Sequence, residues 1–457
     1  MSLEEQIADL KRRLAEKERE NEALRQELEK LRKAIEEWKR GFRERGKRRC
    51  SKAEGKREPR AKKRPGRKAG HQGASRPMPD RIDRTEEHLA PLVCECGGET
   101  EETDEVSSTI VQDIPPVKIE NVRHVTKVRC CRRCGRRAMA KLPGAVRSGE
   151  SVAKVQVGPN ALALATGLRF DQKVPLGGIS RFLQTWFELS ISRGGLSQLF
   201  ARWRVRSTAS YSEIEDHVRS AKVAGADETG IRQNGVGGYA WLVRTPKASL
   251  FRIELSRGEW VIAAMLGDQF TGILCTDFYS AYTCHDDWMH AYCGAHNIRE
   301  AKKIAEVTPC AETKLFRDRL RAIYEAGTLA QTSGDPAARH GVRVRLGQLA
   351  ADGDLGVNAD VARLQARLHE HFHGILTFID HPDVPADNNA TERDIRPFAV
   401  YRKVTGGTRS PQGSLTLAHW MSVTQTLHKN DLELRRFIFE LYQAHFEARP
   451  PPSVFRS

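Results

Sequence analysis

The sequence lacks any run of about 18 apolar residues, the length that a helix needs to cross a membrane. It also lacks the basic and then apolar leader of a secreted protein, because its first residues, MSLEEQIADL, are acidic and helical in pattern. Both absences predict a cytoplasmic chain with no membrane partner. In that compartment the ten cysteines are expected to be thiols or metal ligands rather than disulfides.

The positive charge of the chain is unevenly distributed. The formal net charge is +16, and residues 41–80 alone hold fifteen Lys or Arg against four Asp or Glu. Such an excess in one segment indicates a nucleic-acid partner, although a solvated, disordered tail would have the same composition. The length of 457 residues predicts two to four modules rather than one domain.

Residues 1–40 carry a heptad pattern in which nine of eleven seam positions are apolar, the exceptions being Lys17 and Asn21. A buried Asn at a seam position favours a parallel, two-stranded coiled coil, so we expect self-association through this helix. A single long helix packed on its own chain is the alternative. Residues 41–83 are basic and almost free of apolar residues, which predicts a flexible linker that neutralises phosphates without reading sequence.

Residues 84–145 contain two short cysteine motifs about 35 residues apart. Cys94 and Cys96 form a C-x-C motif, and Cys131 and Cys134 form a C-x-x-C motif. Four thiolates from two such motifs can hold a tetrahedral zinc ion, so we predict a zinc-ribbon-like module with structural Zn²⁺. Reduced, buried cysteines are the alternative.

The third zinc ligand is open at this point, because Cys130 could replace Cys131 and His124 is a weaker spare. Arg132 and Arg133 follow directly and would suit contact with DNA phosphates.

Residues 150–220 are expected to be helical. Within them, residues 176–206 predict two helices separated by a short turn near Ser190, with basic residues at the end of the second. This pattern is compatible with a DNA-reading helix-turn-helix, and plain helical packing is the alternative.

From residue 221 the apolar pattern changes to short runs typical of strands. The expected order is three strands, a helix and a fourth strand; the first strand ends on Asp227 and the fourth delivers Asp277. A carboxylate at the end of an apolar strand is costly to bury unless it is paired or binds a metal. One such Asp alone would be a strand-end cap, but two in one α/β unit favour a functional site, such as one that binds a metal.

The stretch 385-PADNNATERDIRP-397 adds a third acidic group. A helix here would place Asn388, Glu392 and Arg396 on one stripe, with Asp387 as its N-cap and its end at the proline. Glu392 is therefore the best third candidate. Three converging carboxylates repel one another, and Mg²⁺ or Mn²⁺ relieves that repulsion. Two such ions about 4 Å apart promote phosphodiester displacement.

These segments, GADETG, CTDFYSAY and DNNATERDIRP, resemble those of the insertion sequence 66 transposases. The resemblance extends to 293-CGAH-296, to the linker 65-PGRKAGHQG-73, to the cysteine motifs and to the heptads, in the same order. Two departures are Arg129, where the family usually has an aromatic residue, and Gly294, where it usually has Trp. Neither departure changes any of the three acids.

The resemblance implies a multidomain α/β protein with a ribonuclease-H-like catalytic core at residues 221–405. It also implies a helical insertion at about 297–380 and a C-terminal helical segment at 406–457. It implies a D-D-E metal triad. Carried over from the family onto this sequence, the triad falls on Asp227, Asp277 and Glu392. The pair at Cys293 and His296 is expected to position other groups or to contact DNA.

The implied activity is binding of the element's terminal inverted repeats, strand cleavage and strand transfer, in a prokaryotic cytoplasm at the nucleoid. A homo-oligomer and accessory proteins of the element are the expected partners. Candidate phosphate contacts are Arg393, Arg396, Arg402 and Lys403, each of which could instead be a solvated charge. The alternatives are a catalytically silent zinc-containing regulator, another ribonuclease-H-like nuclease, and a coiled-coil scaffold.

Overall fold

The computed structural model describes residues 78–139 and 156–456, apart from residues 89, 102, 104–106, 116, 118, 124, 126 and 286. The predicted coiled coil at 1–40 and nearly all of the linker at 41–83 lie outside these residues. The chain forms two compact units, residues 1–109 and 110–457. No helix in the described part of the chain is long and apolar enough to cross a membrane.

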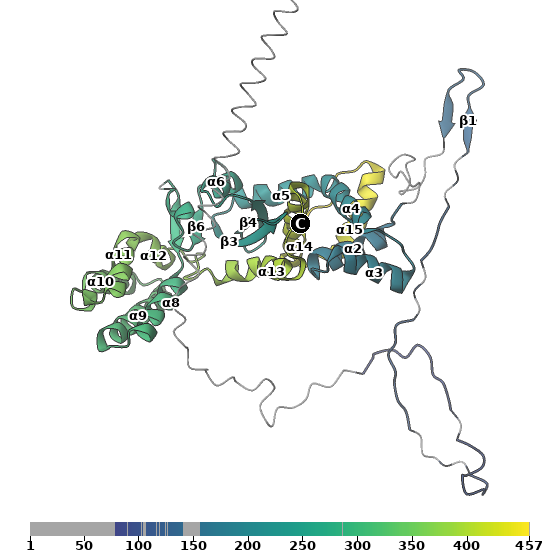
Figure 1. The fold of residues 1–457 in the computed structure, drawn as a ribbon, viewed down its shortest axis with the longest axis horizontal. Helices are drawn as coiled ribbons and strands as arrows, with labels where there is room; N and C mark the ends of the chain where they lie inside the picture. The colour runs from purple at the N-terminus through teal and green to yellow at the C-terminus, as the bar shows by residue number, and fades with distance from the viewer. Residues whose placement is uncertain are drawn as a thin grey trace, which may run out of the picture. The chain divides into compact units, whose positions relative to one another are not determined.

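The second unit is built on a five-stranded mixed sheet with the strand order β5-β4-β3-β6-β7 (Figure 1). Its strands are β3 (Val223–Gln233), β4 (Val236–Arg244), β5 (Ser249–Glu254), β6 (Ile273–Thr276) and β7 (Met289–Tyr292). The first three strands are antiparallel neighbours, and β6 and β7 run parallel to β3. The turn between β3 and β4 has Asn234 and Gly235 at φ 50° and 81°, the positive angles that a tight two-residue hairpin turn requires.

Two sequence expectations about this sheet are wrong. The first strand does not end on Asp227 but continues to Gln233, because β4 pairs with β3 along its whole length. A fifth strand, β7, was not predicted. It has only four residues and an exposed Met289, too short a run to show an alternating pattern.

Helices from both ends of the second unit share one hydrophobic core with the sheet. They are α2 (Pro159–Thr166), the π-helical turn η1 (Gly167–Asp171), α3 (Leu176–Phe187), α4 (Arg193–Arg206), α5 (Thr208–Arg219), α14 (Pro411–Lys429) and α15 (Leu434–Glu447). The expected two-helix arrangement at 176–206 is present. Glu188, at φ 54°, ends α3, and the Ser192 side chain accepts from the Gly195 N–H to cap α4.

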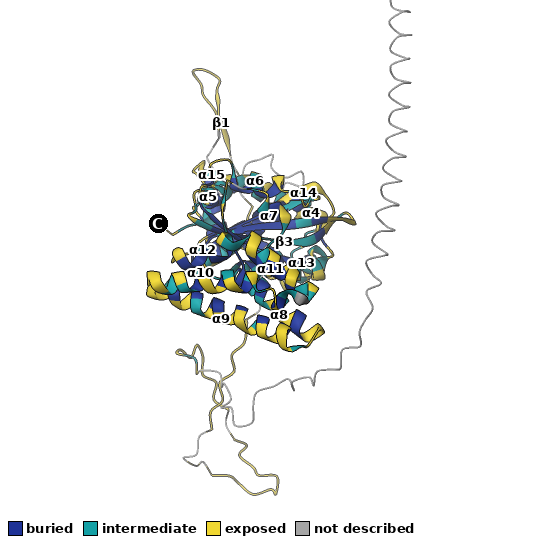
Figure 2. Ribbon diagram, turned by 90° about the vertical axis from the view of Figure 1, so that its left-hand side faces the viewer, coloured by how far each residue is buried: buried dark blue, intermediate teal, exposed yellow. Residues whose placement is uncertain are grey.

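A second core lies between β6, β7 and a group of helices inserted after the sheet. These are α8 (Gly294–Val307), α9 (Ala311–Ser333), α10 (Pro336–Ala351), η2 (Leu355–Val357), α11 (Ala359–Glu370) and α12 (Phe372–Asp380). Figure 1 shows them gathered at one end of the sheet, and Figure 2 shows their exposed residues turned outward. The expected helical stretch at 297–380 is therefore present. The shorter elements are α6 (Trp260–Leu266), α7 (Ser280–Thr283), β1 (Val128–Cys130) and β2 (Arg137–Met139).

The last element of the sheet region, α13 (Asn389–Thr405), corrects two further expectations. It does not stop at Pro397, which lies inside the helix. A proline removes one helical hydrogen bond, but buried Ile395 and Phe398 anchor the helix in the core on both sides of it. The N-cap is Asn388 rather than Asp387, although Asp387 Oδ1 still accepts the Asn389 N–H at 3.0 Å.

Candidate active site

The register of two parallel strands brings the first two acids together. Val223 pairs with Ile273 and Gly225 pairs with Cys275, a constant offset of fifty residues. Asp227 lies two residues beyond the last pair and Asp277 directly follows β6, and the charge of Asp277 contributes to raising the pKa of Asp227. Their carboxylates each accept one backbone N–H, from Glu228 at 2.8 Å and from Tyr279 at 3.0 Å respectively, which fixes their orientation.

Helix α13 carries the third acid, Glu392, in its first turn. Its start lies against β3, where the Asn388 side chain donates to the Ala226 carbonyl at 3.0 Å. Gly225 allows this approach, because a Cβ at that position would collide with Thr391 Oγ1 and lie 3.2 Å from Asn388 Oδ1. The glycine of GADETG therefore permits the contact that brings α13 to the two aspartates.

The three acids interact electrostatically. Burial is the largest cause that raises the pKa of Asp227, to about 7, and the negative charges of Glu228, Asp277 and Glu392 raise it further. A group of hard oxygen donors that repel one another fits Mg²⁺ or Mn²⁺ in its chemistry. Among the described residues, however, no three His, Cys, Asp or Glu side chains form a ready group that could hold a metal ion.

Within the described residues, the two cations near Glu392 both come from α8. Its Oε1 atom lies 3.3 Å from Arg299 Nη2 and 3.9 Å from His296 Nε2. The carboxylate is 37% exposed, so these contacts leave it accessible.

The CGAH motif ties the start of α8 to the start of α13. The buried Cys293 Sγ accepts the Asn388 N–H at 3.1 Å, and the Gly294 N–H donates to the Ala386 carbonyl at 3.0 Å. Burial raises the pKa of the Cys293 thiol, so the neutral form is favoured. These contacts support a positioning role for this motif, and we name the two hydrogen bonds the Cys293 clamp.

A second acid on α13, Asp394, is neutralised within the protein. It accepts from Arg244 Nε at 2.9 Å and pairs with Lys429 Nζ at 2.6 Å. Arg402, one of the predicted phosphate contacts, donates to Thr229 Oγ1 at 2.9 Å and to the Gly230 carbonyl, so it holds β3. The other three predicted contacts on α13, Arg393, Arg396 and Lys403, are exposed.

Sequence reasoning missed Glu228, the residue after Asp227. Its carboxylate accepts from Tyr282 Oη and Arg257, and its side chain is only 4% exposed. The Arg257 guanidinium also lies 3.7 Å from the ring centroid of Tyr279. The available signal was the pair of tyrosines two and five residues after Asp277 in CTDFYSAY.

The first cysteine motif forms a tight turn in the first unit. The Cys94 N–H donates to the Gly98 carbonyl at 2.8 Å, and Gly97 has φ 88°. Hydrogen bonds from the Gly98 backbone and from Cys94 lower the pKa of Cys96, which favours the thiolate that zinc requires.

The second cysteine motif forms a similar turn in the second unit, between β1 and β2. The Cys131 N–H donates to the Arg136 carbonyl at 2.8 Å, and Gly135 has φ 68°. Hydrogen bonds, first from the Cys134 backbone, lower the pKa of Cys131. The Cys130 thiol instead lies 3.1 Å from the Gly135 carbonyl, which favours Cys131 as the ligand. The spare candidate His124 lies outside the described residues.

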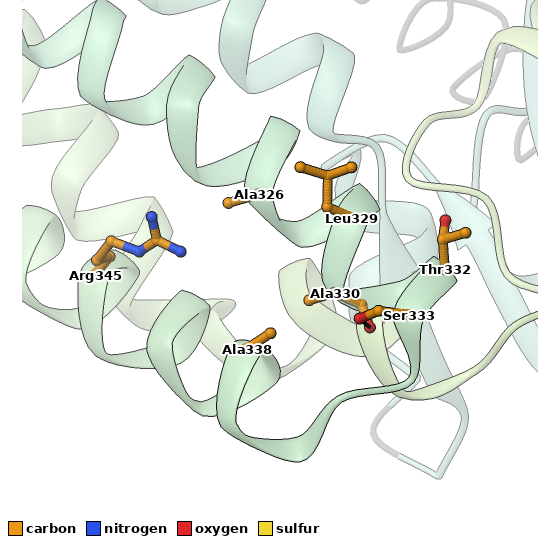
Figure 3. Close-up of a pocket in the computed structure, with 7 residues that line it drawn as sticks. All are labelled: Ala326, Leu329, Ala330, Thr332, Ser333, Ala338 and Arg345. Carbon is orange, nitrogen blue, oxygen red and sulfur yellow. Dashed lines mark hydrogen bonds between the residues drawn. The ribbon is translucent and has the colours of Figure 1, made fainter.

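A shallow apolar groove of about 460 Å³ lies between α9 and α10, away from the acids (Figure 3). Its lining residues are Ala326, Leu329, Ala330, Thr332, Ser333, Ala338 and Arg345. No acid, nucleophilic thiol or histidine lines it, so it offers nothing for the chemistry considered above.

Two comparisons with known proteins bear on this site. Residues 154–415 match the protein family described as "Transposase IS66 family", a range that includes all three acids. The "Uncharacterized protein y4jO" of Sinorhizobium fredii (strain NBRC 101917 / NGR234) is 26% identical over 152 residues. That stretch is 33% of this chain and 46% of the relative, so the chain matches about half the length of this curated relative.

Proposed function

The chain belongs to the IS66 family of transposases, and from this premise we propose that it cuts and joins DNA at the ends of its own insertion sequence. The observation that carries the proposal is that the charges of Asp277 and Glu392, remote in the chain, both act on Asp227 and raise its pKa. The parallel pairing of β3 with β6 and the hydrogen bond from Asn388 to the Ala226 carbonyl support a common site for the three acids. The mixed sheet that holds them supports a ribonuclease-H-like core.

The proposed reaction has two displacements at phosphorus. In the first, a water oxygen attacks the scissile phosphate, the P–O3′ bond breaks, and the products are a 3′-hydroxyl and a 5′-phosphate. In the second, that 3′-hydroxyl attacks a phosphodiester of the target DNA and releases a new 3′-hydroxyl there. No bond between protein and DNA forms in either step.

Asp227, Asp277 and Glu392 would hold Mg²⁺ or Mn²⁺, which supplies activation of the attacking oxygen and stabilisation of the leaving one. The role of this chain's residues is to orient that group. The backbone N–H groups of Glu228 and Tyr279 fix the two aspartates, and the Cys293 clamp fixes the start of α13, which carries Glu392.

Other parts of the chain are proposed to bring DNA and subunits together. The cysteine turns would hold structural zinc through Cys94, Cys96, Cys131 and Cys134, with Arg132 and Arg133 toward phosphates. Residues 1–40 would pair two subunits, and α3 and α4 would contact the inverted repeats. A nucleoid-associated protein working with accessory proteins of the element is the corresponding cellular setting.

The test is a cleavage and strand-transfer assay on a duplex carrying the element's own ends, with Mg²⁺ or Mn²⁺ and the full chain. We expect wild type to nick the ends and join them to a plasmid. Asp227→Asn should lower the rate by roughly 10³-fold or more while it retains DNA binding, because an amide is a poor ligand for a hard cation.

Any of three results would contradict the proposal. Cleavage that persists in Asp227→Asn would exclude the metal triad. Binding without cleavage by wild type, under conditions that include the element's accessory proteins, would favour a silent DNA-binding regulator. Cleavage of branched or hybrid substrates without joining would favour another nuclease.

A further inference from the structure

Helix α8 begins beside the start of α13, the helix that carries Glu392. Its N-cap is Cys293 of the clamp, and Arg299, between one and two turns into the helix, lies 3.3 Å from Glu392 Oε1. The exposed side of α8 is therefore continuous with the candidate active site.

This exposed side carries a row of cations, Arg299, Lys302 and Lys303, which we name the α8 row. Lys302 and Lys303 follow Arg299 by three and four positions, so the three residues share one face of the helix, and all three are exposed. The opposite face holds Ala301 and Ile304, which are buried in the second core. Packing thus fixes the direction in which the row points.

Arg299, the first residue of the row, pairs with Glu392 at 3.3 Å. Of the two acids on α8, Glu300 pairs with Arg367 at 2.5 Å, and Glu306 is exposed about one turn beyond the lysines. In the described part of the chain, neither Lys302 nor Lys303 forms an ion pair. Most arginines of the following helices do form one: Arg317 with Asp318, Arg319 with Asp352, Arg321 with Glu325, Arg343 with Asp380, and Arg363 with Asp360.

We propose that the α8 row binds the DNA backbone next to the cleaved bond, with Arg299 nearest to it and the two lysines further along the strand. This inference rests on the proposed function for the identity of the DNA. Phosphate oxygens are the natural partners of aligned, exposed cations such as Lys302 and Lys303, and the row starts at Arg299, beside Glu392, which would hold the metal. Contacts of this kind position the strand and read no bases.

The experiment measures binding of fluorescein-labelled duplexes to the full chain as a function of salt, without divalent metal. All proteins carry Asp227→Asn, so that no cleavage interferes. One duplex has the element's end and the other has an unrelated sequence of equal length. The test variant is the double substitution Lys302→Gln and Lys303→Gln. The matched control is Arg321→Gln with Arg363→Gln, which removes two paired charges from exposed helix positions.

We expect the test variant to bind both duplexes more weakly and to lower the slope of log K against log salt by about 2, roughly one unit for each lost phosphate contact. The control should leave the slope unchanged. An unchanged slope in the test variant would overturn the proposal. An equal change of slope in the control would also overturn it, because the lower net positive charge of the protein would then explain the effect.

This binding measurement and the cleavage assay of the proposed function together separate the inference from the function on which it rests. If wild type fails to cleave but the slope changes only in the test variant, the α8 row binds DNA and the proposed catalysis is wrong. If wild type cleaves and joins ends but the slope is unchanged, the catalysis stands and the row is a solvated surface.

Discussion

Two carboxylates on α13, only two residues apart, lie in opposite electrostatic environments. Asp394 lies between Arg244 and Lys429, with ion-pair distances of 2.9 and 2.6 Å. Glu392 lies near two other acids, and its nearest cations, Arg299 at 3.3 Å and His296 at 3.9 Å, both come from α8 and leave it 37% exposed. The comparison shows that one helix carries two kinds of charge: a mostly buried charge that is paired twice and holds the helix in place, and a more exposed charge that the proposed function assigns to a metal.

The largest expected effect on stability follows from removing the charge of Asp394, which pairs with Arg244 and Lys429. Asp394→Asn would leave two mostly buried cations without their carboxylate, so we expect the free energy of unfolding to fall by about 2–4 kcal/mol. Glu392→Gln should change it by less than about 0.5 kcal/mol, because no strong pair is lost. Urea denaturation followed by circular dichroism compares the two variants.

Glu325→Gln, which breaks an exposed pair on α9, is the control and should leave the urea midpoint unchanged. The comparison fails if Glu392→Gln destabilises the protein as much as Asp394→Asn does, since Glu392 would then also be a structural charge.

A third case is His419 on α14, a buried titratable group that is kept neutral rather than paired with an opposite charge. Burial, with a smaller contribution from Arg204, lowers the pKa of His419 to about 3, and its Nε2 atom lies 2.8 Å from Ser207 Oγ. The unfolded chain binds a proton near pH 6.5 and the folded chain does not, so the stability present above pH 6.5 is lost as pH falls toward 3.

His419→Gln keeps a polar partner for Ser207 but does not titrate. Between pH 7 and pH 5 we expect wild type to lose about 2 kcal/mol more unfolding free energy than this variant. Thermal denaturation at both pH values measures the difference. Equal losses in the two proteins would mean that His419 is protonated in the fold.

A further, more moderate effect on stability concerns the Cys293 clamp, which holds the start of the helix that carries Glu392. Cys293→Ala removes the acceptor of the buried Asn388 N–H and should cost about 1–2 kcal/mol. It should also slow nicking by about 10-fold, because a small displacement of Glu392 weakens catalysis. Cys293→Ser keeps an acceptor and should recover most of the rate. If alanine and serine behave alike, the thiol has no positioning role.

The sequence predicted the elements that have long or regular patterns. The helices at 176–206 and 297–380, and the strands before Asp227 and Asp277, follow from apolar periodicity. The short strand β7 could not be found, because only its last two residues are buried and it lacks the continuous apolar run that marks β6, a strand of the same length. The passage of α13 through Pro397 could not be found either, because tertiary packing overrides a local helix breaker there.

The candidate site was predictable by residue type but not by geometry. Acids at strand ends pointed to Asp227 and Asp277, yet only the register of β3 and β6 shows that they are neighbours. The environments of Glu392 and Asp394 are indistinguishable in sequence, because Arg244 and Lys429 are remote in the chain. The role of Gly225 likewise depends on how closely α13 approaches β3.

The Cys293 clamp has a consequence for how the family can vary. The two hydrogen bonds join residues 95 and 92 positions apart, so the helices α8 to α12 form a loop closed at its base. Changes of length or sequence far from that base need not be transmitted to Glu392. The insertion can therefore diverge between related proteins, or acquire new partners, while the acids keep their places. The clamp makes this part of the protein a module that is attached at one point to a fixed sheet and helix α13.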